Sequence, residues 1–183
     1  MGAWALEHGC KSWTGIELDD DYISSSRDLL SQHYPDHNWS VIQHDALSYV
    51  EQSDRRWDMI LAAGIIYGYP DSVRFIQSCI AKSDWVVIEC AQPWGPALED
   101  QSLRDTASFS VFNARPTIGP SHRQWGFPSQ IPSSTFVAQV GDAYGFEVHW
   151  DLDQQLRSCL PRHFNNTARG RYCVSLKKPS EIS

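Results

Sequence analysis

The hydrophobic pattern of the first 90 residues alternates between two kinds of segment. Short apolar runs have the length of buried strands, and the segments between them carry apolar residues at helical spacing. The expected strands are residues 13–18, 39–43, 57–62 and 85–90. The run at 57–62 is almost continuously apolar, as in parallel strands that are buried on both faces. Strands alternating with helices predict an α/β fold, with a Rossmann-like, mostly parallel twisted sheet flanked by helices.

Helix signals lie between these strands. Residues 3–8 are typical of the end of a helix, with Gly9 as its stop. Three acidic residues at 19–21 begin a second helix that runs to His33, where negative charge is favourable at the helix N-terminus. A short helix is expected through Tyr49 and Val50, and Pro70 with Asp71 opens another.

The pattern changes after residue 91. Residues 92–130 are rich in Pro, Gly and Ser but contain five aromatic residues, which favours an ordered insert or lid over a disordered segment. A helix is expected at 131–144, ended by Gly145, and two closing strands at 146–152 and 171–176. The whole chain, 1–183, is thus predicted to be one domain with an insert.

Composition narrows the function classes. The 183 residues carry a net charge of -7, which argues against nucleic acid as an obligate partner. Five scattered cysteines include no C-x-x-C pair, so they predict reduced thiols and no metal site. No stretch is long and apolar enough to span a bilayer, and the N-terminus has no signal-peptide pattern. We therefore expect a cytoplasmic protein without a membrane partner.

Acidic or small residues stand at the carboxyl end of each expected strand, where open parallel sheets bind ligands. They are Glu17, Asp45, the turn at 62–64, and Glu89. A carboxylate such as that of Glu17 accepts two hydrogen bonds from a ribose diol, and Leu18 offers an apolar face for a base. The alternative is that these acids only cap the helices that follow. Capping is the favoured interpretation for Asp45 and Asp19 taken singly, but less so for Glu17, because three further acids serve the same cap.

Five segments together resemble the motifs of class I S-adenosylmethionine-dependent methyltransferases. Residues 9–17, GCKSWTGIE, are similar to the family's Gly-Ala-Lys-x-Val-x-Gly-Ile-Asp segment, and 41–46, VIQHDA, to its adenine-contacting turn. Residues 57–67, WDMILAAGIIY, resemble its fourth motif, and 85–89, WVVIE, the following strand. Residues 144–148, YGFEV, match the entry to its sixth strand. Each motif is weak alone, but their order and spacing agree with the family.

The resemblance implies S-adenosyl-L-methionine as cofactor and assigns roles to particular residues. It puts Glu17 on the ribose hydroxyls and Asp45 with Ala46 at the adenine. It puts Ala62, Ala63 and Gly64 on the methionine and methyl-transfer side. The family's strand order is 3-2-1-4-5-7-6, with an antiparallel seventh strand. Because the matches begin inside the first helix, we expect no counterpart of the central first strand and its glycine-rich loop, of which Gly2 would be the last glycine.

Methyl transfer needs mainly alignment, with a general base for some acceptors. The favoured base candidates are Tyr67, which follows the fourth-strand motif, and His163; His122 and Glu89 are further candidates. The alternatives are a helix-packing role for Tyr67 and a surface or core role for the histidines.

A basic segment closes the sequence. Residues 154–178 contain no acid and include Arg157, Arg162, Arg169 and Arg171. Such a segment is typical of a surface for an acidic substrate or for RNA, including tRNA. The alternative is a solvated face that balances the acidic first half.

The sequence thus predicts a methyltransferase acting on an O or N atom of an acceptor, most simply a small molecule. The first alternative is a degenerate copy that keeps the fold without binding the cofactor. An RNA-binding or tRNA-modifying module is a second alternative. A nicotinamide-dependent oxidoreductase is disfavoured because no Tyr-x-x-x-Lys pair is present. Formation of a homo-oligomer stays open.

Overall fold

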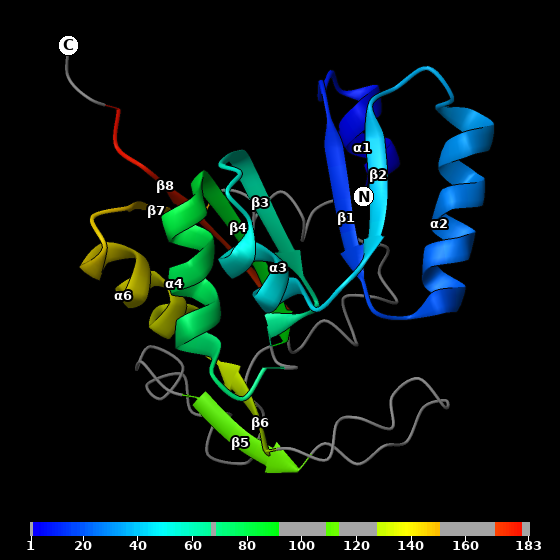
Figure 1. Cartoon of the computed structure of the whole chain (residues 1–183). Helices are drawn as coiled ribbons and strands as arrows, with labels where there is room; N and C mark the ends of the chain where they lie inside the picture. The colour runs from blue at the N-terminus through cyan, green and yellow to red at the C-terminus, as the bar shows by residue number, and fades with distance from the viewer. Residues whose placement is uncertain (1, 67–68, 92–108, 114–127, 151–170, 181–183) are drawn as a thin grey trace, which may run out of the picture. The chain divides into compact units, whose positions relative to one another are not determined.

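The computed structural model describes residues 2–66, 69–91, 109–113, 128–150 and 171–180. Its contacts gather into two compact units, Met1–Asp54 and Arg55–Ser183. Each unit is described by itself, and Figure 1 labels the helices and strands of both.

The first unit is a two-stranded parallel sheet with three helices. Its elements are α1 (Gly2–Glu7), β1 (Trp13–Glu17), α2 (Asp20–His33), β2 (Trp39–Gln43) and α3 (Ala46–Gln52). Strands β1 and β2 pair in parallel, from Trp13 opposite Trp39 to Glu17 opposite Gln43. The strands and helices expected in this part of the sequence are confirmed, each to within two residues.

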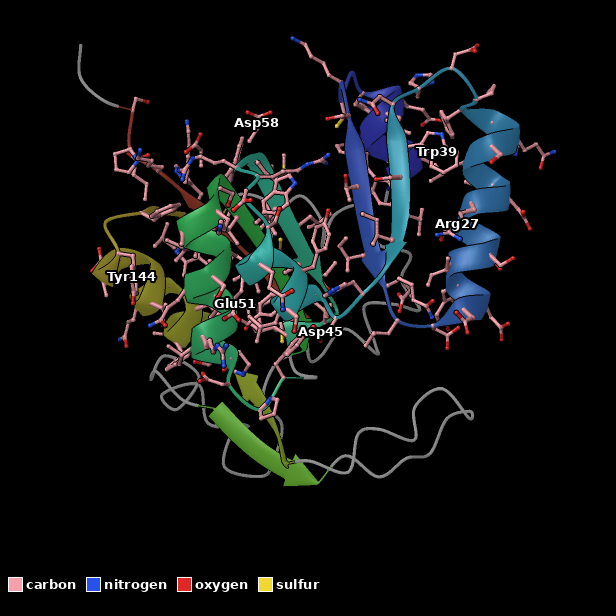
Figure 2. The ribbon with its side chains drawn as sticks, in the orientation of Figure 1. Arg27, Trp39, Asp45, Glu51, Asp58 and Tyr144 are labelled. Carbon is pink, nitrogen blue, oxygen red and sulfur yellow. The ribbon has the colours of Figure 1, made fainter. Side chains whose placement is uncertain are left out.

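Apolar side chains of both strands and two helices form the core of this unit. Leu6 of α1, Ile23 and Leu30 of α2, and Val41 of β2 are buried together, with Trp13, Tyr34 and Trp39 among the residues packed against them. Arg27 of α2 donates a hydrogen bond to the carbonyl of Val41 at 2.7 Å, so the helix is also tied to the strand through its polar side (Figure 2). This directional hydrogen bond adds to the apolar packing between α2 and β2, which is non-directional.

The second unit holds a four-stranded sheet in the order β3-β4-β8-β7. Its strands are β3 (Trp57–Ala63), β4 (Ser83–Ala91), β7 (Glu147–His149) and β8 (Arg171–Lys177). Strand β3 is parallel to β4, whereas β8 is antiparallel to both β4 and β7. A separate antiparallel pair is formed by β5 (Phe109–Asn113) and β6 (Pro128–Pro132).

Helices α4 (Ser72–Lys82) and α6 (Ser134–Ala143) pack on this sheet. The buried face of α4 consists of Phe75, Ile76, Cys79 and Ile80, spaced as one helical stripe. Arg56 joins the end of α4 to the start of β4, since it donates to the carbonyl oxygens of Ala81 and Ser83 and pairs with Asp84 at 2.5 Å. This hydrogen bond from the Arg56 guanidinium holds the pKa of Asp84 below its usual value.

Two expectations about these elements are wrong. Ile131 belongs to β6, and α6 begins only at Ser134 because the side chain of Ser133 caps it by accepting from the Phe136 amide at 3.1 Å. Strand β3 is not buried on both faces, since Met59 is 51% and Leu61 46% exposed. A run of apolar residues does not distinguish a central strand from one at the edge of a sheet.

The order of the strands agrees with the expected α/β class. Pairs β2-β1 and β3-β4-β8-β7 correspond to strands 3-2 and 4-5-7-6 of the family order, with the antiparallel strand in the expected place. Among the described strands, none pairs with both β1 and β3. The predicted fold class, a mostly parallel α/β sheet flanked by helices, is therefore confirmed.

Candidate functional site

Glu17 ends β1 and folds its carboxylate back over the turn that follows. Its Oε1 accepts from the backbone amides of Leu18 at 2.7 Å and Asp19 at 3.1 Å. Within the described residues Oε2 has no hydrogen-bond partner. Glu17 is half-buried, whereas Leu18 beside it is 46% exposed. One carboxylate oxygen is thus fixed by the protein, and the other is available to an outside donor next to an apolar side chain.

Two contacts from the end of β2 hold the same turn. The amide of His44 donates to the carbonyl of Glu17 at 3.1 Å. The side-chain amide of Gln43 donates to the carbonyl of Leu18 at 3.3 Å and to Asp20 Oδ1 at 2.5 Å. The carboxyl ends of β1 and β2 are therefore joined into one edge, as expected for neighbouring parallel strands.

Asp45 lies at the start of α3 (Figure 2) and caps it. Its Oδ1 accepts from the Ser48 amide at 2.8 Å, the geometry of an N-cap. The capping interpretation from the sequence is thus confirmed for Asp45, and its contact to adenine stays a prediction. Ala46 is the first residue of α3 and is half-buried.

A hollow of about 220 Å³ adjoins α3 in the first unit. It is lined by His44, Tyr49, Gln52 and Ser53. The rings of His44 and Tyr49 meet edge-on, with centroids 5.7 Å apart, and His44 Nδ1 lies 2.9 Å from the carbonyl oxygen of Asp45. Two aromatic rings, an amide and a hydroxyl group therefore line the hollow beside α3.

The turn after β3 lies in the second unit. Ala62 is buried, and Ala63 is opposite Glu89 of β4. The amide of Gly64 donates to the carbonyl of Glu89 at 2.9 Å, and Gly64 has a φ of 65°. This left-handed conformation favours glycine. A methionine-side role for Ala62, Ala63 and Gly64 stays a prediction.

Gly2 has a packing role in the first unit. It is buried at the start of α1, and a Cβ there would come within 2.8 Å of the indole of Trp13. Close packing against a ring explains a glycine at this position, and a contact of Gly2 with a cofactor stays a prediction.

The predicted base candidates Tyr67 and His163 lie outside the described residues, as does His122. The same holds for Arg157, Arg162 and Arg169 of the basic segment, and the side chain of Arg171, which begins β8, is not described either.

Three of the described cysteines, Cys79, Cys90 and Cys173, are buried. Burial raises the pKa of the Cys79 thiol to about 12, so it is not a nucleophile near neutral pH.

Gln43 is a further candidate residue, which the sequence alone does not predict. The only signal for it was its place at the end of a strand expected to neighbour the one that ends in Glu17.

Within the described residues, no helix is long and apolar enough to cross a membrane, and no group of three potential metal ligands is found.

No family model matches the sequence, and no curated protein matches it either. Several solved structures share its fold. The N-terminal domain of EvdMO1, with S-adenosylhomocysteine bound, is 17% identical with a TM-score of 0.62, and the match covers 97% of this chain and 69% of that one. The mycolic acid cyclopropane synthase CmaA1, in complex with S-adenosylhomocysteine, is 11% identical with a TM-score of 0.59. This match covers 96% of this chain and 73% of that one.

A third match is the N-methyltransferase NodS from Bradyrhizobium japonicum, in complex with S-adenosylhomocysteine. It is 14% identical with a TM-score of 0.56, and the match covers 98% of this chain and 74% of NodS. The fold is common to these proteins despite identities below 20%, and it agrees with the strand order and the antiparallel β8. The chain therefore has the Rossmann-like fold of class I S-adenosylmethionine-dependent methyltransferases.

Proposed function

We propose that this protein binds S-adenosyl-L-methionine and transfers its methyl group to an O or N atom of an acceptor. The observation that carries the proposal is the carboxylate of Glu17 at the carboxyl end of β1. Its Oε1 is held by two amides of its own turn, at 2.7 and 3.1 Å. A carboxylate oriented in this way accepts from vicinal hydroxyls without first having to be ordered.

The residues of the first unit fit the nucleoside half of that cofactor. Glu17 would accept from the ribose hydroxyls, and the exposed side chain of Leu18 would cover one face of the adenine. Asp45 uses one oxygen to cap α3, so we assign recognition of the base to the Asp45–Ala46 turn as a whole. A contact of Ala62, Ala63 and Gly64 with the methionine part is proposed from the family resemblance alone.

S-adenosylmethionine carries its methyl group on a sulfonium, which is already an activated donor. The work left to this chain is to bind, to orient and to keep water out. A base for the acceptor is proposed at Tyr67 or His163. We propose a small-molecule acceptor, because the net charge of -7 disfavours a phosphate backbone.

Calorimetric titration with S-adenosylhomocysteine tests the proposal. We expect binding in the micromolar range, weakened about 10- to 100-fold by Glu17→Ala, since hydrogen bonds to a charged group are lost. The matched control is Asp28→Ala, which removes an exposed carboxylate of α2 from the same unit. Absence of heat with folded protein would support the degenerate, non-catalytic copy instead.

The acceptor class needs a separate experiment. Transfer of labelled methyl from S-adenosylmethionine is to be followed with small-molecule fractions and with bulk tRNA. Label in the small-molecule fraction supports the proposal. Label in tRNA, or RNA binding that falls steeply with added salt, would favour the basic segment at 154–178 as an RNA-binding surface.

A further inference from the structure

Gln43 reaches across from β2 into the turn that carries Glu17. The two residues are directly opposite in the parallel register. Gln43 Nε2 donates to the carbonyl oxygen of Leu18 at 3.3 Å and to Asp20 Oδ1 at 2.5 Å. Both partners are acceptors, which settles the orientation of the side-chain amide with its nitrogen toward the turn.

The contact with Leu18 has a geometric consequence. The carbonyl of Leu18 and the amide N–H of Asp19 belong to one planar peptide unit. The carbonyl end of this unit is held by Gln43, and its N–H end donates to Glu17 Oε1 at 3.1 Å. Rotation of the peptide plane would break both hydrogen bonds together. Donation to a carbonyl also polarises the peptide and strengthens its N–H as a donor.

We propose that Gln43 is a positioning residue, which sets the orientation of the Glu17 carboxylate through the Leu18–Asp19 peptide. It thereby tunes affinity for the ribose diol without touching the ligand. This inference rests on the proposed function and deepens it, because it names what holds the carboxylate proposed for ribose binding in place. The hydrogen bond to Asp20 orients the Gln43 side chain itself. The hydrogen bonds that orient the Glu17 carboxylate therefore involve three successive residues, Leu18, Asp19 and Asp20.

The variant that isolates this role is Gln43→Met, which keeps the length of the side chain and removes the donor. Ser40→Ala is the matched control. It removes another side-chain hydrogen bond between the same two strands, from Ser40 Oγ to Thr14 Oγ1 at 3.2 Å, away from the turn. A loss of strand pairing in general would affect both variants alike.

The first readout is a double-mutant cycle on the dissociation constant of S-adenosylhomocysteine. We expect Gln43→Met to weaken binding about 5- to 10-fold in the native background, and less than about 2-fold when Glu17→Gln is already present. Ser40→Ala is expected to leave the constant within about 2-fold. Equal effects of Gln43→Met in both backgrounds would overturn the proposal, because Gln43 would then act independently of Glu17.

The second readout needs no ligand and is native-state hydrogen exchange. The Asp19 amide is expected to exchange about 5-fold faster in Gln43→Met. The Ser48 amide, which donates to Asp45, is expected to be unchanged. If S-adenosylhomocysteine does not bind the native protein, the proposed function fails, and exchange alone decides whether Gln43 orders the turn. An unchanged Asp19 amide would refute the positioning role in either case.

Discussion

Glu17 and Asp45 are acids at the ends of neighbouring strands, but their carboxylates do different things. Asp45 has the short side chain that reaches the amide three residues ahead, and it caps α3 in this way. Glu17 has one more methylene group, and its carboxylate bends back onto the amides of Leu18 and Asp19. Asp45 directly precedes α3 and caps it, whereas Glu17 stands two residues before Asp19, which is the cap of α2.

Gly141 of α6 packs closely against the sheet, and this contact can be tested with a single substitution. A Cβ at this position would lie 2.5 Å from Cδ2 of Leu176, which is fully buried in β8. Gly141→Ala is therefore expected to lower the free energy of unfolding by about 1–3 kcal/mol, despite the better helix propensity of alanine. The measurement is urea denaturation followed by circular dichroism.

The control for Gly141→Ala is Asp142→Ala, at the next, exposed position of the same helix. It is expected to change stability by less than about 0.5 kcal/mol. A stabilised Gly141→Ala protein would show that Leu176 moves aside at little cost, and that α6 does not approach the sheet as closely as described.

Four of the described helices begin where a short polar side chain accepts a hydrogen bond from a backbone amide of the first turn. Caps of this kind are Asp19 for α2, Asp45 for α3, Asp71 for α4 and Ser133 for α6. The cap of α2 also borders the candidate site, because Asp19 donates its own amide to Glu17 and accepts from the amides of Asp21 and Tyr22. The start of α2 and the turn that carries Glu17 are thus one structure.

Asp19→Ala is expected to destabilise the protein by about 1 kcal/mol, since it leaves first-turn amides of α2 without their side-chain acceptor. Asp28→Ala, on the exposed side of the same helix, is the control and is expected to be neutral. Thermal unfolding by circular dichroism measures both. Equal midpoints for the two variants would contradict the capping role of Asp19.

Helices and strands were predictable from the sequence where the spacing of apolar residues and the position of capping residues indicated the same element. The strand at 39–43 and the helix after Asp19 are examples, because burial and capping are local consequences of residue type. The start of α6 was not predictable, since Ile131 is apolar in either interpretation and its pairing with Ser110 is a long-range contact. The contact of Gln43 with the Glu17 turn was not predictable for a similar reason. Only the register of β1 with β2 places Gln43 beside that turn.

At the scale of the molecule, the sheet of the second unit has exposed apolar side chains. Met59 is opposite Trp85 and Leu61 is opposite Val87 in the parallel register, so these side chains share one face of the sheet. Met59, Leu61 and Trp85 are all exposed. Among the described strands, β3 pairs with β4 alone. Natural edge strands commonly carry lysine, proline or a bulge against association, and residues 57–63 contain neither lysine nor proline.

This surface predicts that the protein self-associates as its concentration rises, and that Leu61→Lys reduces the association. A lysine at this position charges both the exposed face and the strand edge, which opposes edge-to-edge pairing. Leu29→Lys is the matched control, because Leu29 is exposed to a similar degree on α2, in the other unit. Sedimentation velocity over a series of concentrations is the measurement. A native protein that stays monomeric throughout, or equal effects of the two lysines, would exclude this face of β3 as the contact. If only Leu61→Lys gives a monomer, the apolar side chains on β3 are not the core of a closed sheet but the surface through which copies of the chain meet.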